Sequence, residues 1–325
     1  MHYSFIVFAT GVSGVVVDTQ YDYGTLARFP IAFRESHTNR TIPGLGLIDL
    51  SESFTALVAD DLIPANASWH HVDAILIANG LDRIELDREV SDAASGTEYA
   101  FNALIGASII SEFATERGGF LTTPVSRDAG QFVISPQNAP AYANEGVLFY
   151  ADNAHGEYWA VPTAARIVSS TSIQMAADEV IFEPCFLKSF ARHIFLPQDT
   201  LEELLDELRQ RGVVVSYNPD FDGTQYISLQ EIPDSIVDSL PSIQILIQDQ
   251  NLRRISIAII NPREYVEDDP DDERSKQLLF KPRQVNHPYS PCTLGPLVLN
   301  KLVVHLDTQN HRVGFGEPLT DLEFF

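Results

Sequence analysis

Three consecutive blocks near the C-terminus decide the fold: Leu294-Gly295-Pro296-Leu297-Val298-Leu299, then Val303-Val304-His305-Leu306-Asp307, then Asn310-His311-Arg312-Val313-Gly314-Phe315-Gly316. The first block combines a Gly-Pro turn with an apolar run, and the second is a hydrophobic strand that ends in an aspartate. The third block opens with turn residues and continues as Val-Gly-Phe. The sequence therefore predicts a strand, a turn and a further apolar segment in this order.

Short β-rich segments recur through the rest of the chain, and helical periodicity is rare. The predicted strands are His2–Phe8, Val15–Val17, Phe29–Phe33, Leu45–Leu50, Ala74–Ala78, Gln131–Ser135, Val147–Tyr150, Tyr158–Val161, Ser242–Gln248, Arg254–Ile260 and Lys301–Asp307. One helix is predicted between Pro197 and Gly212, because leucines recur there at helical spacing. A second helix is predicted over Tyr99–Glu112.

The closing segment resembles that of the pepsin-like aspartic proteases, in which a Leu-Gly-Asp turn and a short helix lead into a strand ending in Asp, a turn and Val-Gly-Phe. Five further blocks follow in the order of that family: Val72–Ala78, Gly130–Ile134, Gly156–Trp159, Phe195–Pro197 and Ser239–Ile243. The resemblance spans nearly the whole chain at low identity. It implies a mostly β, bilobal fold of two β-barrel-like lobes, residues 1–145 and 146–325, with a central cleft and few short helices.

Members of that family carry one Asp-Thr/Ser-Gly loop in each lobe, and the two carboxylates share one proton because like charges so close cannot both ionise. In the first half of this chain, Asp18-Thr19 follows an apolar strand, so Asp18 is the predicted first acid, although Gln20 replaces the glycine. A second register places Ala9 at that position. It deletes the opening strand predicted over His2–Phe8, and the Asp18 register is therefore preferred.

The second half departs further from the family pattern. Alignment on Phe195–Pro197 places Lys188 where the second aspartate is expected, while Ser189 retains the neighbouring hydroxyl and a phenylalanine replaces the glycine. Asp178 and Glu183 lie upstream, and neither is followed by Thr/Ser-Gly. The sequence therefore predicts that the second catalytic acid is lost.

Two hypotheses describe what Lys188 does instead. In the first, Asp18 and Lys188 face each other as an ion pair, which removes the shared proton. In the second, Lys188 extends into solvent and contacts nothing. Phe33 is the predicted counterpart of the tyrosine that covers the family's cleft, because no tyrosine occurs between Gly24 and Glu98.

The net charge of the chain limits the classes of partner that it can bind. Acidic residues number 45 against 21 basic ones, which gives a net charge of -24. Such a field repels nucleic acid and anionic membrane surfaces and attracts basic peptides at long range. No apolar run is long enough to span a bilayer, so no membrane insertion is expected. No Cys/His cluster has the spacing of metal ligands, and neither a metal nor another cofactor is expected.

The compartment stays open at this stage. Cys185 and Cys292 allow at most one disulfide, and we interpret them as two buried thiols because both lie in apolar surroundings. The triplets beginning at Asn39 and Asn66 would accept glycans in a secretory compartment. The resemblance implies a secreted or vacuolar protein, whereas the first residues lack the basic charge of a typical signal peptide, since Arg28 is the first basic residue of the Lys/Arg type.

Three functions are consistent with these observations. The leading hypothesis is a monomeric, non-catalytic pepsin-like protein that binds a peptide or protein partner through its cleft or its surface. The second is an atypical active aspartic endopeptidase, which requires an acid from another register, such as Asp178. The third is an unrelated acidic β-rich binding domain, which predicts a sandwich or a single barrel instead of two lobes.

Overall fold

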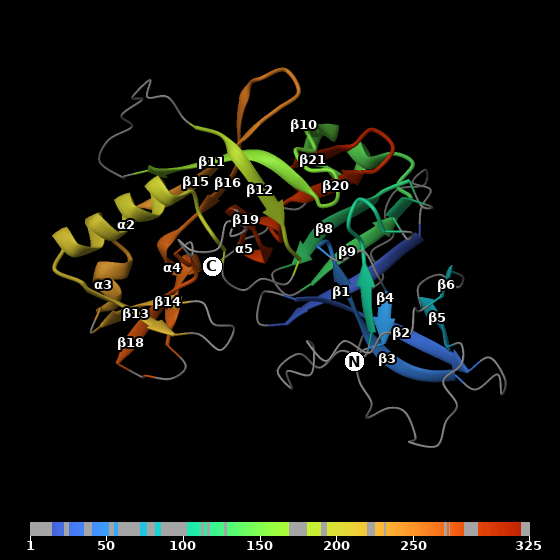
Figure 1. The fold of residues 1–325 in the computed structure, drawn as a ribbon, viewed down its shortest axis with the longest axis horizontal. Helices are drawn as coiled ribbons and strands as arrows, with labels where there is room; N and C mark the ends of the chain where they lie inside the picture. The colour runs from blue at the N-terminus through green and yellow to red at the C-terminus, as the bar shows by residue number, and fades with distance from the viewer. Residues whose placement is uncertain are drawn as a thin grey trace.

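A computed structural model describes the chain over residues 15–22, 26–35, 41–51, 55–57, 72–76, 82–85, 103–111, 114–115, 118–126, 129–168, 181–189, 194–219, 225–230, 232–269, 272, 274–282 and 292–319. Strands from the first half gather on one side of the molecule, and α2, β13, β14 and β18 lie on the other (Figure 1). The described chain is mostly β and bilobal, as predicted.

One twelve-stranded sheet joins strands from both ends of the chain. From the first half it contains β1 (Val15–Asp22), β2 (Leu26–Glu35), β3 (Thr41–Asp49), β4 (Thr55–Leu57), β5 (Val72–Leu76), β6 (Asp82–Glu85), β7 (Ala103–Gly106), β8 (Phe120–Ser126) and β9 (Ala129–Ile134). Three later strands complete it: β10 (Phe149–Asp152), β20 (Val303–Asp307) and β21 (Arg312–Gly316). Because β20 pairs with β8, the C-terminal segment is hydrogen-bonded directly to first-half strands. The division of the lobes at residue 145 stays a prediction.

Two smaller sheets belong to the second half. The five-stranded sheet has the order β16 (Arg254–Ile260), β15 (Ser242–Gln248), β11 (Ala160–Val168), β12 (Glu183–Leu187) and β19 (Cys292–Leu294). The four-stranded sheet has the order β13 (Val214–Pro219), β14 (Gln225–Gln230), β18 (Ser275–Leu278) and β17 (Val266–Asp268). The strands predicted over Ser242–Gln248 and Arg254–Ile260 are confirmed to the residue.

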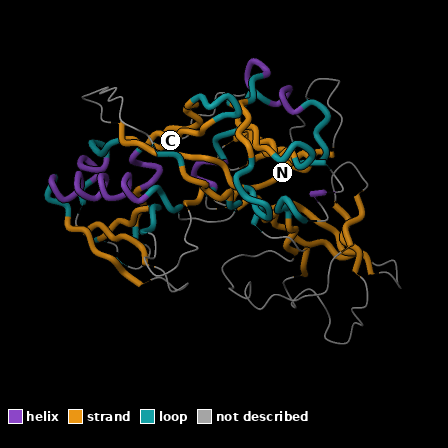
Figure 2. The backbone as a smooth tube through the Cα atoms, turned by 45° about the horizontal axis from the view of Figure 1, so that its top comes forward, coloured by secondary structure: helices purple, strands orange, loops and turns teal. Residues whose placement is uncertain are grey.

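The described helices are few and short apart from α2. They are η3 (Ala139–Tyr142), η4 (Asn144–Gly146), α2 (Gln198–Gln210), α3 (Asp234–Val237), α4 (Pro262–Tyr265) and α5 (Pro296–Leu299). Figure 2 shows α2 at one end of the molecule, away from the large sheet. None of the helices in the described ranges is long and apolar enough to cross a bilayer.

Helix α2 confirms the helix that the leucine spacing predicted between Pro197 and Gly212. Its four leucines and Thr200 are buried, and the Thr200 hydroxyl donates a hydrogen bond of 2.9 Å to the Ala165 carbonyl of β11. Asp199 lies in the first turn and Arg209 in the last, which suits the helix dipole. Gly212 follows the helix with a φ of 80°, a left-handed conformation that glycine adopts without strain.

The helix predicted over Tyr99–Glu112 is wrong in its described part. Ala103–Gly106 forms β7, which pairs in parallel with β3, and a turn follows it. The amide of Ala107 donates to the Asp49 carbonyl at 2.7 Å, which extends the pairing past the strand. Alanine, leucine and isoleucine are compatible with a helix or a strand, so pairing with β3 determines that this segment is a strand.

The closing segment has the predicted architecture. Strand β19 leads through Gly295 into α5, and β20 and β21 then form an antiparallel pair. Gly314 is required in β21, because a Cβ atom there would lie 2.8 Å from the ring of Tyr150 on β10. Trp159 is fully buried where the lobes meet, and its indole N–H donates to the Ala107 carbonyl at 2.8 Å.

The interpretation of the two cysteines as free thiols is wrong. Cys185 of β12 and Cys292 of β19 form a disulfide, with Cα atoms 4.4 Å apart. These residues are directly opposite each other in the parallel pair β12·β19. Both are buried, as expected, but apolar surroundings are equally suited to a bridge, and sequence spacing could not reveal their register.

Candidate functional site

Two parallel strand pairs occur between the strands of the described ranges, one in the first half of the chain and one in the second half. In the first, β3 runs beside β7, with Asp49 opposite Gly106. In the second, β12 runs beside β19, with Leu187 opposite Leu294. The chain leaves β3 at Asp49 and leaves β12 at Leu187, so each pair delivers a loop from the end of a buried strand.

The two loops meet through a single side chain. The Ser189 hydroxyl accepts a hydrogen bond from the Leu50 amide at 3.1 Å and donates one to the Ile48 carbonyl at 2.6 Å. These two backbone groups lie on either side of Asp49. The contact therefore sets the residues Lys188-Ser189 of one half against Asp49-Leu50 of the other half.

Asp49 is the carboxylate of the first loop and is buried. Its Oδ1 atom accepts hydrogen bonds from the Ser51 amide at 2.8 Å and the Ser51 hydroxyl at 2.7 Å. A buried carboxylate needs such donors, because burial without them is costly. Leu50 follows Asp49 in the first loop, and Ser189 follows Lys188 in the second loop. Only Ser189 of these two residues has a hydroxyl that can form a hydrogen bond to the opposite loop.

Lys188 precedes Ser189 in the second loop. Its amide donates to the Leu294 carbonyl at 3.0 Å, which ties the loop to β19, and its side chain is half-buried. Lys188 therefore directly follows the last residue of β12, whereas Asp49 is the last residue of β3.

Comparison with solved structures identifies the fold. The chain is similar to the crystal structure of basic 7S globulin from soybean, with a TM-score of 0.63 over 94% of this chain and 97% of that chain, at 14% sequence identity. The fold is that of the pepsin-like aspartic proteases. At this identity the likeness shows the fold alone. It contradicts the hypothesis of an unrelated β-rich domain built as a sandwich or a single barrel.

Comparisons at the level of sequence give no further assignment. No protein-family model matches the chain, and no curated protein matches it. The pepsin-like fold therefore rests on the structural match alone. The chemistry of the site must be argued from the residues of this chain.

Asp18 does not occupy the first loop. It lies in the interior of β1, opposite Gln131 of β9, and is exposed. The Gln131 side-chain amide donates to its carboxylate at 3.1 Å. The hypothesised ion pair between Asp18 and Lys188 is wrong, since no nitrogen–oxygen contact within 4.0 Å joins these two described residues. Asp18 belongs to the pairing of β1 with β9 instead.

The other predicted site residues lie away from the loops or outside the described residues. Thr19 is buried in β1 opposite Gly130. Phe33 is part of β2, which pairs with β3 and β5, and its role over the cleft stays a prediction. Ala9, Asn39, Asn66 and Asp178 all lie outside the described ranges.

Asp49 is the residue that the sequence reading missed. Leu47-Ile48-Asp49 has the expected form of an apolar strand ending in an aspartate, but Leu50 and Ser51 replace the hydroxyl and the glycine. The described part of the Val72–Ala78 block, Val72–Leu76, forms β5, which pairs antiparallel with β2 and β6. The strand that runs parallel to β3 is β7, and its apolar sequence Ala-Leu-Ile-Gly was the signal available in the sequence.

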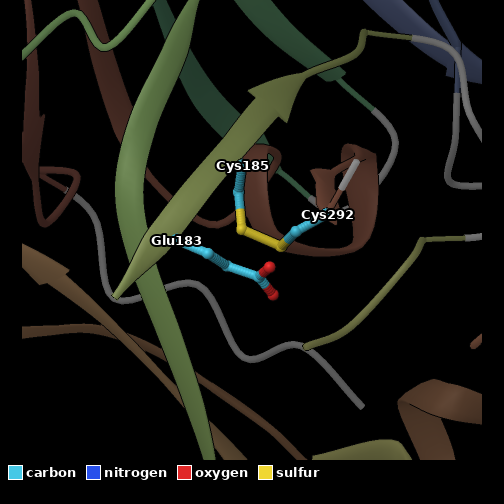
Figure 3. Close-up of side chains that lie close together, drawn as sticks. All are labelled: Glu183, Cys185 and Cys292. Atoms are coloured by element: carbon cyan, nitrogen blue, oxygen red, sulfur yellow. A yellow bond between two sulfur atoms is a disulfide. The ribbon is translucent and has the colours of Figure 1, made fainter. Parts of the chain in front are cut away.

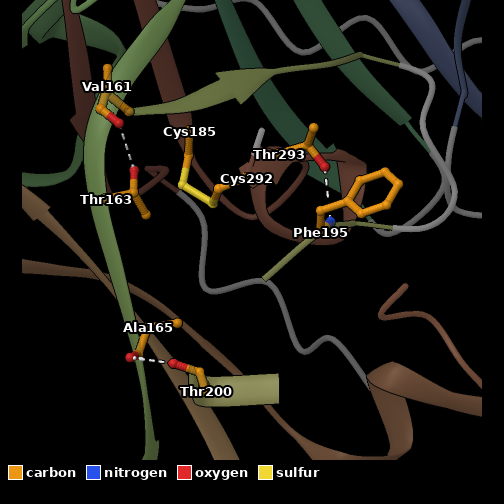
Figure 4. The surroundings of a disulfide bond; sticks show 8 residues. All are labelled: Val161, Thr163, Ala165, Cys185, Phe195, Thr200, Cys292 and Thr293. Carbon is orange, nitrogen blue, oxygen red and sulfur yellow. Dashed lines mark hydrogen bonds between the residues drawn. A yellow bond between two sulfur atoms is a disulfide. The ribbon is translucent and has the colours of Figure 1, made fainter. Parts of the chain in front are cut away.

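The disulfide stabilises the strand pair that carries the second loop. Figure 4 shows the bridge between β12 and β19, with Thr293 accepting a hydrogen bond from the Phe195 amide at 2.9 Å. Glu183 lies beside the two sulfur atoms, and Figure 3 shows its carboxylate next to the bridge. Because both sulfurs are oxidised, they offer no thiolate, and this trio is not a metal site.

A largely buried polar network lies on strands β10, β20 and β21 of the large sheet. The Tyr150 hydroxyl is 2.9 Å from Nδ1 of His305, and the Arg312 guanidinium lies 4.0 Å above the Tyr150 ring. Burial lowers the pKa of His305 to about 4, which favours the neutral imidazole. Burial alone would raise the pKa of Asp307, but hydrogen bonds from Asn310 and Arg312 outweigh it and hold that pKa below its ordinary value.

Proposed function

We propose that this chain is a non-catalytic pepsin-like protein that binds a peptide or protein partner. The observation that supports it is the Ser189 contact, which sets a loop containing Lys188 against a loop containing Asp49. One half of the junction therefore offers a carboxylate, and the other offers an amine where a second carboxylate is required.

The chemistry of peptide hydrolysis on this scaffold explains why the difference matters. One carboxylate must activate water as a base while a second, sharing the proton, acts as an acid. A lysine side chain carries a positive charge at acidic and neutral pH, so it favours the ionised form of a nearby carboxylate. Asp49 and Lys188 then lack the single shared proton on which general acid–base catalysis depends.

The likeness to basic 7S globulin from soybean supports the pepsin-like fold on which the proposal is built, and the loss of catalysis is inferred from this chain's own residues. The binding half of the proposal rests on architecture: extended peptides pair with exposed backbone groups in a β-rich cleft. Fold-level analogy is weaker than chemistry at the site, so the proposal depends on Lys188.

Proteolysis at acidic pH tests the proposal. Purified protein is incubated with an unfolded protein substrate, with and without a statine-type peptide that mimics the tetrahedral transition state. We expect no inhibitor-sensitive cleavage from the natural chain or from Asp49→Asn. Lys188→Ala removes the charge without adding an acid and should also be inactive, whereas Lys188→Asp tests whether a second carboxylate restores cleavage.

One outcome contradicts the proposal: inhibitor-sensitive cleavage by the natural chain that is lost in Asp49→Asn. That result would identify an atypical aspartic endopeptidase, with its second acid supplied from elsewhere in the chain. Binding is measured separately, as the change in fluorescence anisotropy of the labelled statine peptide. Absence of both binding and cleavage would discard a peptide-binding role for the central loops.

A further inference from the structure

Sheet edges carry unpaired N–H and C=O groups, and natural proteins protect them with charges, bulges, prolines or covering segments. Two described edges of this chain are covered by other parts of the chain. At β10, the Tyr150 carbonyl accepts a hydrogen bond of 2.8 Å from the Gln250 amide. At β19, all three residues are buried, and the Thr293 amide donates to the Phe195 carbonyl at 3.0 Å.

Two further edges are protected by charge or irregularity. Strand β16 begins at Arg254 and shifts register against β15, and the Lys301 ammonium donates to the Ile259 carbonyl at 2.9 Å. Strand β17 has three residues, of which Glu267 and Asp268 are charged. Each feature is one of the known means of preventing an additional strand from pairing.

Within the part of the chain that the structure describes, no such feature protects the middle of strand β13. It pairs along all six residues with β14 and is the outer strand of its sheet, with no other described strand beside it. Its sequence, Val-Val-Ser-Tyr-Asn-Pro, has no charged side chain, and its proline is the last residue. Val214 is 56% exposed and Tyr217 is 43% exposed, so the strand is accessible along much of its length. In an antiparallel strand, alternate residues direct their backbone groups away from the existing partner.

The negative charge around the β13 edge favours a positively charged binding partner. Helix α2 packs against β13, and its sequence contains five acidic residues and one arginine. The whole chain carries a net charge of -24, so a second copy would bring the same excess of negative charge to the edge. A positively charged segment meets a complementary field, which favours its association.

We infer that the β13 edge binds an extended, cationic segment of a partner protein by strand addition. The segment pairs its backbone with that of β13, and its basic side chains lie in the negative field around α2. This surface lies on the four-stranded sheet, and the inference does not depend on whether the central loops bind peptide or cleave it.

A labelled peptide tests the inference directly. The probe is a fluorescein-labelled peptide of four Lys-Val repeats, and its affinity is measured by fluorescence anisotropy. The variant Val214→Lys/Tyr217→Lys places charge on the edge at two exposed positions without touching the core. We expect it to bind the probe about tenfold more weakly than the natural chain. Hydrogen exchange of the natural chain should show slower exchange of β13 amides when the probe is bound.

Matched controls separate strand addition from general attraction. Leu252→Lys/Ile259→Lys adds the same charge at apolar positions that are 75% and 49% exposed and lie off β13, and it should bind within about twofold of the natural chain. The same probe with alternate backbone amides N-methylated keeps its charge and should lose binding. Equal binding of the methylated probe, or equal weakening in both double variants, overturns the inference. So does sedimentation that shows a dimer which dissociates in Val214→Lys/Tyr217→Lys, because that result assigns the edge to a second copy.

Discussion

The Ser189 hydroxyl lies 2.6 Å from the carbonyl oxygen of Ile48 and 3.1 Å from the amide nitrogen of Leu50, so one side chain serves the backbone on both sides of Asp49. The two backbone groups are separated from Ser189 by about 140 residues of chain, as the sequence separations of 141 and 139 show. This contact therefore joins the halves of the molecule at the position where the two loops meet.

Ser189→Ala should destabilise the protein by about 1–3 kcal/mol, because it leaves a partly buried N–H and a partly buried C=O without their partner. Urea unfolding followed by tryptophan fluorescence measures the change, since Trp159 is buried at the same junction. Ser189→Thr keeps the hydroxyl and should lie close to the natural chain. Equal stability of the alanine and natural proteins would show that the bridge contributes nothing.

The sequence predicted the architecture better than it predicted the site. Strands such as Ser242–Gln248 and the helix with its leucine face depend on local periodicity, which a sequence displays directly. Lys188 and Ser189 were placed from the Phe195–Pro197 block that follows them, and the Ser189 hydroxyl does lie at the junction.

Asp18 and Asp49 show why the first loop was misplaced. Both follow apolar strand residues, and Asp18 has the better local match because threonine follows it. The difference is tertiary: β1 lies between two antiparallel partners, β2 and β9, whereas β3 has the parallel partner β7 and ends at the contact with Ser189. Strand register and strand neighbours depend on long-range pairing, which local pattern does not contain.

Removal of the disulfide should cost several kilocalories per mole. The bridge joins residues 107 positions apart, and a loop of that size corresponds to about 4–5 kcal/mol in the chain-entropy account. We therefore expect Cys185→Ala/Cys292→Ala to unfold at a clearly lower urea concentration than the oxidised natural chain. Reduction of the natural chain by a phosphine under mildly denaturing conditions should lower its midpoint, while the double variant should not respond. A reductant-insensitive natural chain would contradict this prediction.

Gly314→Ala should be destabilising because of the close approach of two strands. A Cβ atom at this position would lie 2.8 Å from one ring carbon of Tyr150, and the next two are at 3.1 and 3.2 Å. Overpacking of this kind typically costs about 1–3 kcal/mol. Gly156→Ala is the matched control, because a Cβ atom there meets nothing within 4 Å. Thermal unfolding should lower the midpoint of the first variant and leave the second close to the natural chain.

Because of His305, the folded chain should lose stability as the pH falls into the mildly acidic range. Its pKa is lowered to about 4 in the folded chain, chiefly by burial, while an unfolded histidine titrates near about 6.5. Above pH 6.5 both states are neutral and the folded chain has its full stability. As the pH falls from about 6.5 to about 4, the unfolded chain takes up a proton that the native chain does not, and about 3 kcal/mol of stability is lost.

His305→Gln should flatten the pH dependence over this range, because glutamine does not titrate and can still accept a hydrogen bond from Tyr150. Urea midpoints measured from pH 7.5 to pH 4 report the difference between variant and natural chain, so carboxylates common to both cancel. Asp307 does not account for the loss, since its pKa is lowered below the ordinary aspartate value and its contribution falls away at still lower pH. The exposed His311 provides the control, and His311→Asn should keep the natural profile. If His305→Gln loses stability with acid as steeply as the natural chain, His305 is not the group responsible.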